Sequence, residues 1–497
     1  MKPDGADRLA SRLVMAAPAG AALSEGEGRI LDEGRVGHLI LFRRSFRSRE
    51  ETIALVAGAR ARAGAPMLVA ADQEGGIISV ASAVIGSAPS PMHLGARRDE
   101  GAVEAWARSQ ASRLRALGVD MVLAPVLDVQ ARAGSRVIGT RSFGGGPGLI
   151  ARLGAAAVRG SLSGGAIPVG KHFPDHGGVR ADSHVGLPVD RRSRREMLAA
   201  ASAPSRAAIA AGLPAVMIAH VAYPGLGTGS RPASLSPEVI EGFLRSRLGF
   251  GGVVLSDALE MEGFPGEEAV PAALAAGIDL FCAARSLAQG VRVARRLARS
   301  IRGDRRAERR AEESAARVET LLRGRPRKSR EAPPPPERPW EGIVRLGRGR
   351  WRPPGAGGWR MLVPARLGGR LSLPVGLRVA VAPWGESFLR RRVIPIPFDP
   401  DAPARRRALA RVPATETLVL GTLTRGDLPE GQRRMLAEAA RRPGRRIVVA
   451  LLDPHPVLDL PEERLFTFDF RPPTLEALFR ILLGEKLPEG RLPLASR

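Results

Sequence analysis

The segment from Lys171 to His184, KHFPDHGGVRADSH, gathers groups that can transfer protons or bind hydroxyls. It holds three of the chain's seven histidines, a lysine and two aspartates. Asp182 and His184 are separated by one residue, so in an extended loop their side chains point the same way. The carboxylate can then orient the imidazole and stabilise its protonated form, which makes the pair a candidate general acid/base. A structural Asp–His hydrogen bond is the alternative.

Asp257 stands at the end of the apolar run GGVVLSD. A buried strand has no need of a charge at that position unless a site lies beyond it. A carboxylate there can act as a nucleophile, as a base or as a ligand to hydroxyls and metals. The alternative is a helix N-cap, for which Ser256 is the better candidate.

Lys171 and His172 end another apolar run, IPVGKHF. Arginine replaces lysine almost everywhere in this chain, whose other lysines are Lys2, Lys328 and Lys486. A lysine kept inside an apolar strand indicates that a compact ammonium is needed there. It can bind sugar or phosphate oxygens, or it can form an internal salt bridge with a neighbouring strand.

The motif DQEGG places Asp72 and Glu74 before two glycines, without the glycine pattern that cradles phosphates. This favours a hydroxyl-rich ligand over a nucleotide. Arg141, in GTRSFGG, can hold an acyl oxygen or pair with a nearby carboxylate. The acids and histidines lack a recognised metal-ligand spacing, so a metal site is only weakly supported.

These residues lie at or near the ends of short apolar runs that alternate with segments of helical length, a rhythm typical of repeated βα units. The runs cover residues 13–19, 36–42, 66–75, 119–129, 167–173, 214–224, 251–260 and 277–283. In a TIM-type barrel the carboxyl ends of all strands meet at one rim, where loops build the active site. An open doubly wound sheet would bring them together less completely. The sequence therefore predicts a TIM-type (β/α)8 barrel over residues 1–325.

A proline- and arginine-rich stretch, residues 326–345, contains PPPP and cannot form a helix or a central strand. We expect it to be a linker. Beyond it, apolar runs at 377–384, 416–423, 445–454 and 464–470 are separated by helical segments such as 429–442. This pattern predicts a smaller α/β sandwich domain over residues 346–497.

The chain has 497 residues and a formal net charge of +26, which would usually suggest nucleic-acid binding. Its arginines are spread along helix-like stretches without interleaved aromatics, so we expect no specific nucleic-acid partner. Cys282 is the single cysteine and sits in an apolar run, which excludes a disulfide framework and a cysteine-based metal site. No run reaches the roughly 18 apolar residues of a membrane span. The N-terminus is not typical of a secretion signal, so we expect a cytoplasmic protein.

Taken in order, six motifs resemble glycoside hydrolase family 3, in particular its β-N-acetylglucosaminidase branch. They are DQEGG, APVLDV, VIGTRSFG, KHFPDHGGVRADSH, MIAHVAYP and GGVVLSDALEM. The end EKLPEGRLPLAS resembles the C-terminal α/β domain of that family. The resemblance implies that Asp257 is the nucleophile, His184 the acid/base and Asp182 its orienting partner. It also implies sugar contacts, which it assigns to Asp72, Arg141, Lys171 and His172.

The implied reaction is retaining hydrolysis of terminal β-linked N-acetylglucosamine, with cell-wall muropeptides as the most natural substrate and no metal or organic cofactor. Oligomeric state and the role of the second domain stay open. Two positions depart from the branch. The usual R-V-x-R after DQEGG is replaced by Ile77, Ile78, Ser79 and Val80, and Asp175 stands where glycine is usual. A family 3 glycosidase or phosphorylase with altered sugar preference, or a catalytically weakened carbohydrate-binding protein, is therefore the alternative.

Overall fold

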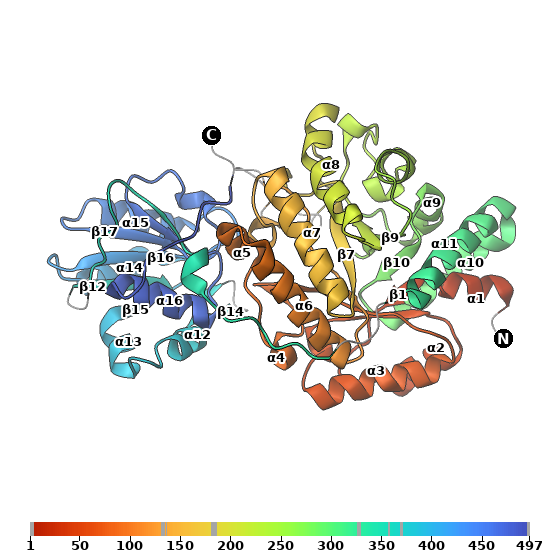
Figure 1. Ribbon diagram of the computed structural model, residues 1–497, viewed down its shortest axis with the longest axis horizontal. Helices are drawn as coiled ribbons and strands as arrows, with labels where there is room; N and C mark the ends of the chain where they lie inside the picture. Colours follow the sequence, from red (N-terminus) through yellow and green to blue (C-terminus); the bar gives the residue numbers. More distant parts are fainter. Residues whose placement is uncertain are drawn as a thin grey trace. The chain divides into compact units, whose positions relative to one another are not determined.

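The computed structural model describes residues 4–130, 135, 137–179, 186–325, 330–355, 358–367 and 371–494 (Figure 1). The chain divides into two compact units. The barrel unit consists of Met1–Ala88 and Asp99–Pro335, and the sheet unit of Pro89–Arg98 and Pro336–Arg497.

The described part of the barrel unit contains a closed barrel of eight parallel strands, in the order β1-β10-β9-β8-β7-β6-β3-β2. The strands are β1 (Val14–Ala16), β2 (His38–Leu41), β3 (Val69–Ala71), β6 (Met121–Val122), β7 (Ile167–Phe173), β8 (Ala215–Ile218), β9 (Val253–Ala258) and β10 (Leu280–Ala283). Each lies within one of the apolar runs picked out in the sequence. The predicted TIM-type barrel is confirmed.

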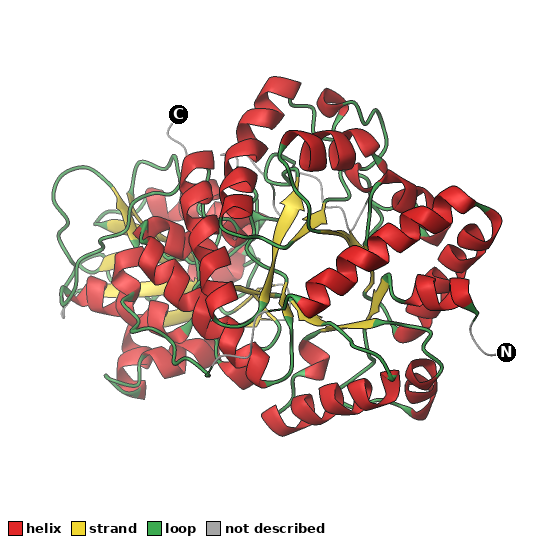
Figure 2. Cartoon of the chain, turned by 45° about the vertical axis from the view of Figure 1, so that its right-hand side comes forward, coloured by secondary structure: helices red, strands yellow, loops and turns green. Residues whose placement is uncertain are grey.

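Helices enclose the strands (Figure 2). Those of the barrel unit are α1 (Gly5–Ser11), α2 (Glu25–Asp32), α3 (Arg49–Ala63), α4 (Ser82–Ile85), α6 (Glu100–Ala116), α7 (Pro147–Ser163), α8 (Arg194–Ala210), α9 (Val270–Ala276), α10 (Leu287–Gly303) and α11 (Arg305–Arg323). A π-helical segment, Glu238–Arg247, follows β8 in place of an α-helix. In the described residues, no helix combines the length and the apolar character that crossing a membrane requires.

Most residues of the barrel strands are apolar because both faces of each strand are buried. In β1, Val14 and Ala16 pack in the cluster between the strands and the surrounding helices, whereas Met15 packs in the cluster inside the barrel. Side chains alternate between faces along a strand, so a strand covered on both sides reads as a continuous apolar run. This explains why the runs stood out in the sequence.

The described residues of the sheet unit form a six-stranded sheet in the order β11-β18-β17-β16-β12-β15, in which β11 alone is antiparallel to its neighbour. The strands are β11 (Val344–Leu346), β12 (Trp359–Pro364), β15 (Val393–Ile396), β16 (Thr417–Thr422), β17 (Arg446–Ala450) and β18 (Glu463–Phe466). The helices are α5 (Pro91–Arg97), α12 (Leu373–Ala380), α13 (Glu386–Arg392), α14 (Ala402–Ala410), α15 (Glu430–Ala440) and α16 (Pro472–Leu483).

Helices cover both faces of this sheet. Leu362 of β12 packs in one cluster with Leu409 of α14 and Met435 of α15. The ring of Trp359, also on β12, stacks on Phe479 of α16 with ring centroids 6.0 Å apart. The predicted α/β sandwich is therefore present.

The prediction of a strand over residues 377–384 in the sheet unit is wrong. The segment forms the end of α12 and the turn that follows it. An alternating strand would place Leu377, Val379 and Val381 on one face, but Val379 is 56% exposed while Leu377 and Val381 are buried together with Ala380. Burial at i, i+3 and i+4 is the helical period, which a short run of leucine, valine and alanine does not distinguish from a strand.

Candidate active site

A cavity of about 210 Å³ opens at the carboxyl ends of the barrel strands. Its polar lining residues are Asp72, Glu74, Arg141, Lys171, His172, His176 and Asp257. Its apolar and small lining residues are Ile40, Phe42, Ile78, Leu123, Val137, Met217, Ala258, Met261, Cys282 and Ala284. The cavity therefore has a strongly charged part and an apolar part.

Five of the seven predicted site residues line this cavity. Those five are Asp72, Arg141, Lys171, His172 and Asp257. They come from the ends of β3, β7 and β9 and from the loop after β6. The other two, Asp182 and His184, lie outside the described residues.

Lys171 joins two carboxylates in the charged part of the cavity. Its Nζ lies 2.5 Å from Oδ1 of Asp72 and 2.6 Å from Oε1 of Glu74. Burial lowers the pKa of Lys171, but these carboxylates outweigh it and the net shift is upward. The ammonium therefore stays charged while only 3% of its side chain is exposed. The internal salt bridge considered from the sequence is present.

Glu74 also pairs with Arg141 through two parallel hydrogen bonds. Nε of Arg141 donates to Oε2 at 2.7 Å and Nη2 donates to Oε1 at 2.8 Å. Burial raises the pKa of Glu74, but the positive charges of Arg141 and Lys171 outweigh it and lower the pKa to about 2. Arg141 therefore holds a carboxylate of the protein, which was one of its two expected uses. Glu74 was not among the predicted site residues.

His172 is fixed by a buried aspartate. Its Nδ1 lies 2.7 Å from Oδ2 of Asp128, and the backbone N–H of His176 donates to Oδ1 of the same carboxylate at 2.6 Å. Burial raises the pKa of Asp128, but the imidazoles of His172 and His176 outweigh it and lower the pKa. The ring of His172 thus has one nitrogen engaged and its orientation set, while Nε2 lies 3.4 Å from Nη2 of Arg141.

Lys171 and His172 are neighbours in the chain, yet both line the cavity. In a regular strand adjacent side chains point to opposite faces. The pairing of β7 with β8 shifts register between Gly170 and Phe173, so the strand is irregular where these two residues lie. A cis peptide bond joins the two residues at this point, and both side chains line the cavity.

Asp257 is a half-buried carboxylate near the end of β9. The backbone N–H of Ala258 donates to its Oδ1 at 2.7 Å. Burial raises the pKa of Asp257, but the imidazoles of His172 and His220 outweigh it and the net shift is downward. The carboxylate is therefore ionised at neutral pH. Asp257 does not serve as a helix N-cap, which was the alternative role considered from the sequence.

His220 lies beside the end of β9, since β8 and β9 pair in parallel with Ile218 opposite Ser256. Its Nδ1 lies 2.8 Å from Oγ of Ser234, and its ring packs on Phe264 with centroids 5.0 Å apart. Burial lowers the pKa of His220. It is not among the residues that line the cavity.

Among the described residues, no group of three or more histidine, cysteine, aspartate or glutamate side chains could hold a metal ion. The carboxylates of the cavity are instead engaged by ammonium, guanidinium and backbone N–H groups. Such a site can bind hydroxyls with its charged part and present an ionised carboxylate to a bound ligand.

Residues 11–321 match the N-terminal domain of glycosyl hydrolase family 3. The chain belongs to this family. A β-hexosaminidase of Stenotrophomonas maltophilia (strain K279a) is 38% identical over 270 residues, which are 53% of this chain and 79% of the relative. A β-hexosaminidase of Thiobacillus denitrificans is 40% identical over 272 residues, 53% of this chain and 75% of the relative. The family resemblance read from the sequence motifs is confirmed.

Solved structures are similar to this chain over its whole length or over part of it. A β-N-acetylglucosaminidase from Paenibacillus sp. str. FPU-7 is 28% identical, with a TM-score of 0.86 over 98% of both chains. Native NagZ from Neisseria gonorrhoeae is 32% identical, with a TM-score of 0.52 over 62% of this chain and 97% of the other. The protein is therefore a glycoside hydrolase of family 3, and the prediction of an enzyme is confirmed.

Asp175 is the position where this family 3 enzyme departs from the glycine usual in its branch. Its Oδ1 accepts from the backbone N–H of Val129 at 2.6 Å, and its Oδ2 pairs with Nη2 of Arg192 at 2.5 Å. Burial, together with the charge of Asp128, outweighs Arg192 and raises the pKa of Asp175 to about 6. The side chain joins the end of β7 to the loop after β6 and to Arg192.

Proposed function

We propose that this family 3 enzyme is a retaining exo-β-N-acetylglucosaminidase. The observation that carries the proposal is the ionised carboxylate of Asp257 in a cavity whose other part bears Asp72, Lys171 and His172. Relatives named β-hexosaminidase supply the sugar class. Cytoplasmic recycling of cell-wall muropeptides is the setting that fits an exo-acting enzyme of this kind.

In the first step, an Asp257 oxygen attacks the anomeric carbon of the terminal sugar, and the bond to the leaving-group oxygen breaks. His184, oriented by Asp182, donates its proton to that oxygen, and a glycosyl ester of Asp257 forms. In the second step, His184 takes a proton from water, whose oxygen attacks the anomeric carbon. The ester bond breaks, so the sugar leaves with retained configuration and the carboxylate is restored.

The charged part of the cavity binds the hydroxyls of the sugar in this proposal. The Asp72 side chain is 20% exposed, whereas the Glu74 side chain is fully buried, so Asp72 is the carboxylate that accepts hydrogen bonds from hydroxyls. Lys171 and His172 approach the same hydroxyls. Arg141 is engaged by Glu74 and contributes through its remaining N–H groups.

Covalent trapping tests the role of Asp257. A 5-fluoro glycosyl fluoride of N-acetylglucosamine forms the ester quickly and releases it slowly, so peptide mapping should find the label on Asp257. Asp257→Asn should lose at least about a thousandfold in kcat on an aryl β-N-acetylglucosaminide, because a neutral amide is a poor nucleophile. Label on another residue would contradict the assignment.

The leaving group tests the role of His184. His184→Ala should be far more impaired on a substrate with a poorly acidic leaving group than on a nitrophenyl glycoside, whose departure needs little protonation. Equal losses on both substrates would contradict general acid catalysis by this residue. Turnover of N-acetylglucosaminyl-anhydro-N-acetylmuramic acid by the full chain tests the muropeptide substrate separately.

A glycosidase or phosphorylase with a different sugar preference is the second candidate. It is favoured by Val80, which stands at the second arginine of the R-V-x-R that the branch usually carries and packs against the apolar cluster outside the barrel strands. An apolar side chain there cannot donate hydrogen bonds to a sugar substituent. Comparing kcat/KM on aryl β-N-acetylglucosaminide and aryl β-glucoside, each with and without phosphate, distinguishes the two candidates. A catalytically weakened carbohydrate-binding protein would bind the sugar without turnover in all four assays.

A further inference from the structure

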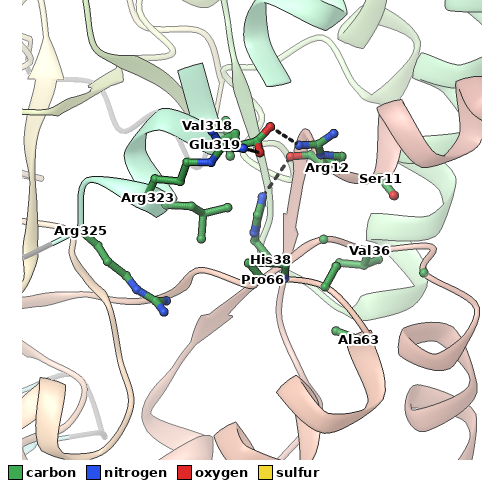
Figure 3. Close-up of a pocket in the computed structure, with 14 residues that line it drawn as sticks. Ser11, Arg12, Val36, His38, Ala63, Pro66, Val318, Glu319, Arg323 and Arg325 are labelled. Carbon is green, nitrogen blue, oxygen red and sulfur yellow. Dashed lines mark hydrogen bonds and ion pairs between the residues drawn. The ribbon is translucent and has the colours of Figure 1, made fainter. Parts of the chain in front are cut away.

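A second and larger cavity lies at the other end of the barrel. Its volume is about 560 Å³, compared with about 210 Å³ for the cavity at the carboxyl ends of the strands. It is formed where β1, β2 and β3 begin and where α11 ends (Figure 3). Cavities of this size accommodate organic ligands, and the amino ends of barrel strands ordinarily serve stability and not catalysis.

The walls of this cavity are largely apolar. Val36, Ala63, Pro66, Val318 and Leu322 contribute aliphatic surface from the start of β2, the end of α3, the loop before β3 and the last turns of α11. An aliphatic lining favours a ligand with an apolar body, because covering it removes this surface from water.

His38 is a buried polar side chain of the lining, as is Ser11, and it offers no charge to a ligand. Its Nε2 lies 3.0 Å from the carbonyl oxygen of Arg12, and its Nδ1 accepts from the backbone N–H of Leu68 at 3.2 Å. With Nδ1 an acceptor, the ring is neutral and Nε2 carries the hydrogen. Burial lowers the pKa of His38 to about 4, in agreement with this arrangement. Both ring nitrogens are used within the protein.

The rim, in contrast, carries an excess of positive charge. The side chains of Arg12, Arg323 and Arg325 are 51%, 80% and 41% exposed and all line the cavity. Among the described lining residues Glu319 is the one carboxylate, and it is shared between Nη2 of Arg12 at 2.9 Å and Nη2 of Arg323 at 2.5 Å. Figure 3 shows the Arg12 and Glu319 pair beside His38, with Arg325 approaching from another side.

Arg325 is the rim guanidinium with the weakest internal partner. Its Nη1 lies 3.6 Å from Oδ1 of Asp120. That buried carboxylate also accepts hydrogen bonds from Arg115 and, at 2.5 Å, from Arg60. Three guanidiniums therefore share one buried carboxylate. Arg325 gives up only its weak contact with Asp120 when its guanidinium turns toward an anion in the cavity.

We propose that this cavity binds a small amphipathic organic anion. An aromatic or aliphatic body occupies the apolar walls, and one carboxylate, sulfonate or phosphate group lies at the rim between Arg325 and Arg323. The combination of apolar walls, a neutral histidine and a positive rim fits such a ligand better than a sugar, which needs hydroxyl-binding groups, or a cation, which the rim repels. The site is separate from the one that the proposed glycosidase reaction uses.

The experiment compares two fluorescent probes that share a naphthyl-phenylamine body on the purified full chain. One is 8-anilinonaphthalene-1-sulfonate, and the other is N-phenyl-1-naphthylamine, which lacks the sulfonate. We expect saturable binding of the sulfonate and binding of the neutral probe at least about tenfold weaker, because only the former meets the rim. Equal affinities would overturn the anionic preference.

Charge variants locate the site. Arg325→Gln and Arg323→Gln should each weaken sulfonate binding about three- to tenfold, whereas Glu319→Gln should strengthen it because a competing carboxylate is removed. Arg309→Gln is the matched control, since Arg309 is exposed on α11, the helix that carries Arg323, but does not line the cavity. If Arg309→Gln weakens binding as much as Arg325→Gln, the effect is one of overall charge and the proposal is wrong.

Ala63→Phe fills the cavity from its wall and should abolish the saturable component. Thermal unfolding and hydrolysis of an aryl glycoside check that this variant is folded, because Ala63 lies far from the residues at the carboxyl rim. Saturable binding that persists in a folded Ala63→Phe protein would place the ligand elsewhere and overturn the assignment. Competition by N-acetylglucosamine would likewise place the probe in the other cavity.

Discussion

Glu74 is the residue on which the charged part of the active-site cavity depends, because it neutralises both Arg141 and Lys171. Glu74→Gln keeps the shape but leaves two buried cations with one fewer carboxylate. We expect it to lower the free energy of unfolding by about 3 kcal/mol or more, as for other broken buried ion pairs. Urea unfolding at pH 7 measures this.

The matched control for that substitution is Glu104→Gln. Glu104 also pairs with an arginine, Arg159, at 3.0 Å, but both side chains are more than 40% exposed. Its loss should change the free energy of unfolding by no more than about 1 kcal/mol. Similar effects of the two substitutions would show that the buried network contributes no more than a surface pair.

Titration of the Asp175 carboxyl makes the free energy of unfolding depend on pH. Its pKa is raised from 3.8 to about 6 in the folded protein, mainly by burial, so the folded state holds this proton to higher pH than the unfolded state does. The stabilisation that the protonated Asp175 gives the folded state is therefore fully present below pH 4 and is lost as the pH rises to about 6. Asp175→Asn removes the titration, so the stability of the wild type relative to this variant should fall by up to about 3 kcal/mol across that window.

Urea unfolding of both proteins at several pH values between 4 and 8 measures this difference. Above pH 7 the two stability curves should run parallel, because Asp175 is then ionised in both states. Curves that stay parallel from pH 4 to 8 would mean that Arg192 holds the folded carboxyl near its ordinary pKa.

Residue types and spacing pointed to five of the polar groups that line the cavity but not to Glu74 or His176, which line it as well. What they did not reveal is which groups engage one another. The bidentate pairing of Glu74 with Arg141 joins positions 67 residues apart. The apolar wall residues Phe42 and Met261 carried no signal either, since an aromatic or methionine at a strand end is as often part of the core.

At the scale of elements, α6 and α7 pack closely because α7 and its C-cap residue present glycines to α6. A Cβ at Gly160 would lie 2.3 Å from the carbonyl oxygen of Glu104, and one at Gly164 would lie 2.5 Å from that of Arg108. Both contacts are with backbone, which cannot move without shifting the helix. The close approach of the two helices therefore requires these glycines.

Gly160→Ala should accordingly destabilise the barrel unit by about 1–3 kcal/mol, the usual cost of overpacking. Gly148→Ala on the same helix is the control, because its added Cβ meets nothing within 4 Å. There the better helix propensity of alanine should leave stability unchanged or raise it by up to about 1 kcal/mol. Thermal unfolding of the two variants side by side measures the difference, and equal effects would show that the α6–α7 contact yields easily.

The elements of the barrel could be predicted because its strands are buried on both faces and its helices are charged on one. The sheet unit was harder. There α12 was taken for a strand, since leucine, valine and alanine suit either structure over a short run. The irregularity of β7 at Lys171 and His172, which both line the cavity, has no signature in the apolar pattern of the run.

At the scale of the whole molecule, the segment 89–98 belongs to a different unit from its neighbours in the sequence. In the chain it falls between two segments of the barrel unit, but it folds as part of the sheet unit. Met92 and Ala96 of α5 pack with Phe466 and Phe468, and Oγ of Ser90 donates to the carbonyl oxygen of Phe468 at 2.9 Å. The sequence could not reveal this, because PMHLGAR gives no indication of which unit buries it.

This arrangement predicts how a chain cut after residue 335 behaves. The cut removes the partners of α5, including Glu341, whose Oε2 pairs with Nη2 of Arg97 at 2.7 Å, and leaves Met92 without its apolar surroundings. The burial of a methionine side chain contributes about 2 kcal/mol, so a seven-residue helix without these contacts should not persist. Trypsin should then cleave after Arg97 or Arg98 at least about tenfold faster than in the full chain.

Cleavage after Arg285, an exposed position between β10 and α10, serves as the internal control and should be unchanged. Adding residues 336–497 as a separate chain should restore protection at α5 alone, and equal cleavage of the cut and full chains would mean that the barrel unit holds this helix by itself.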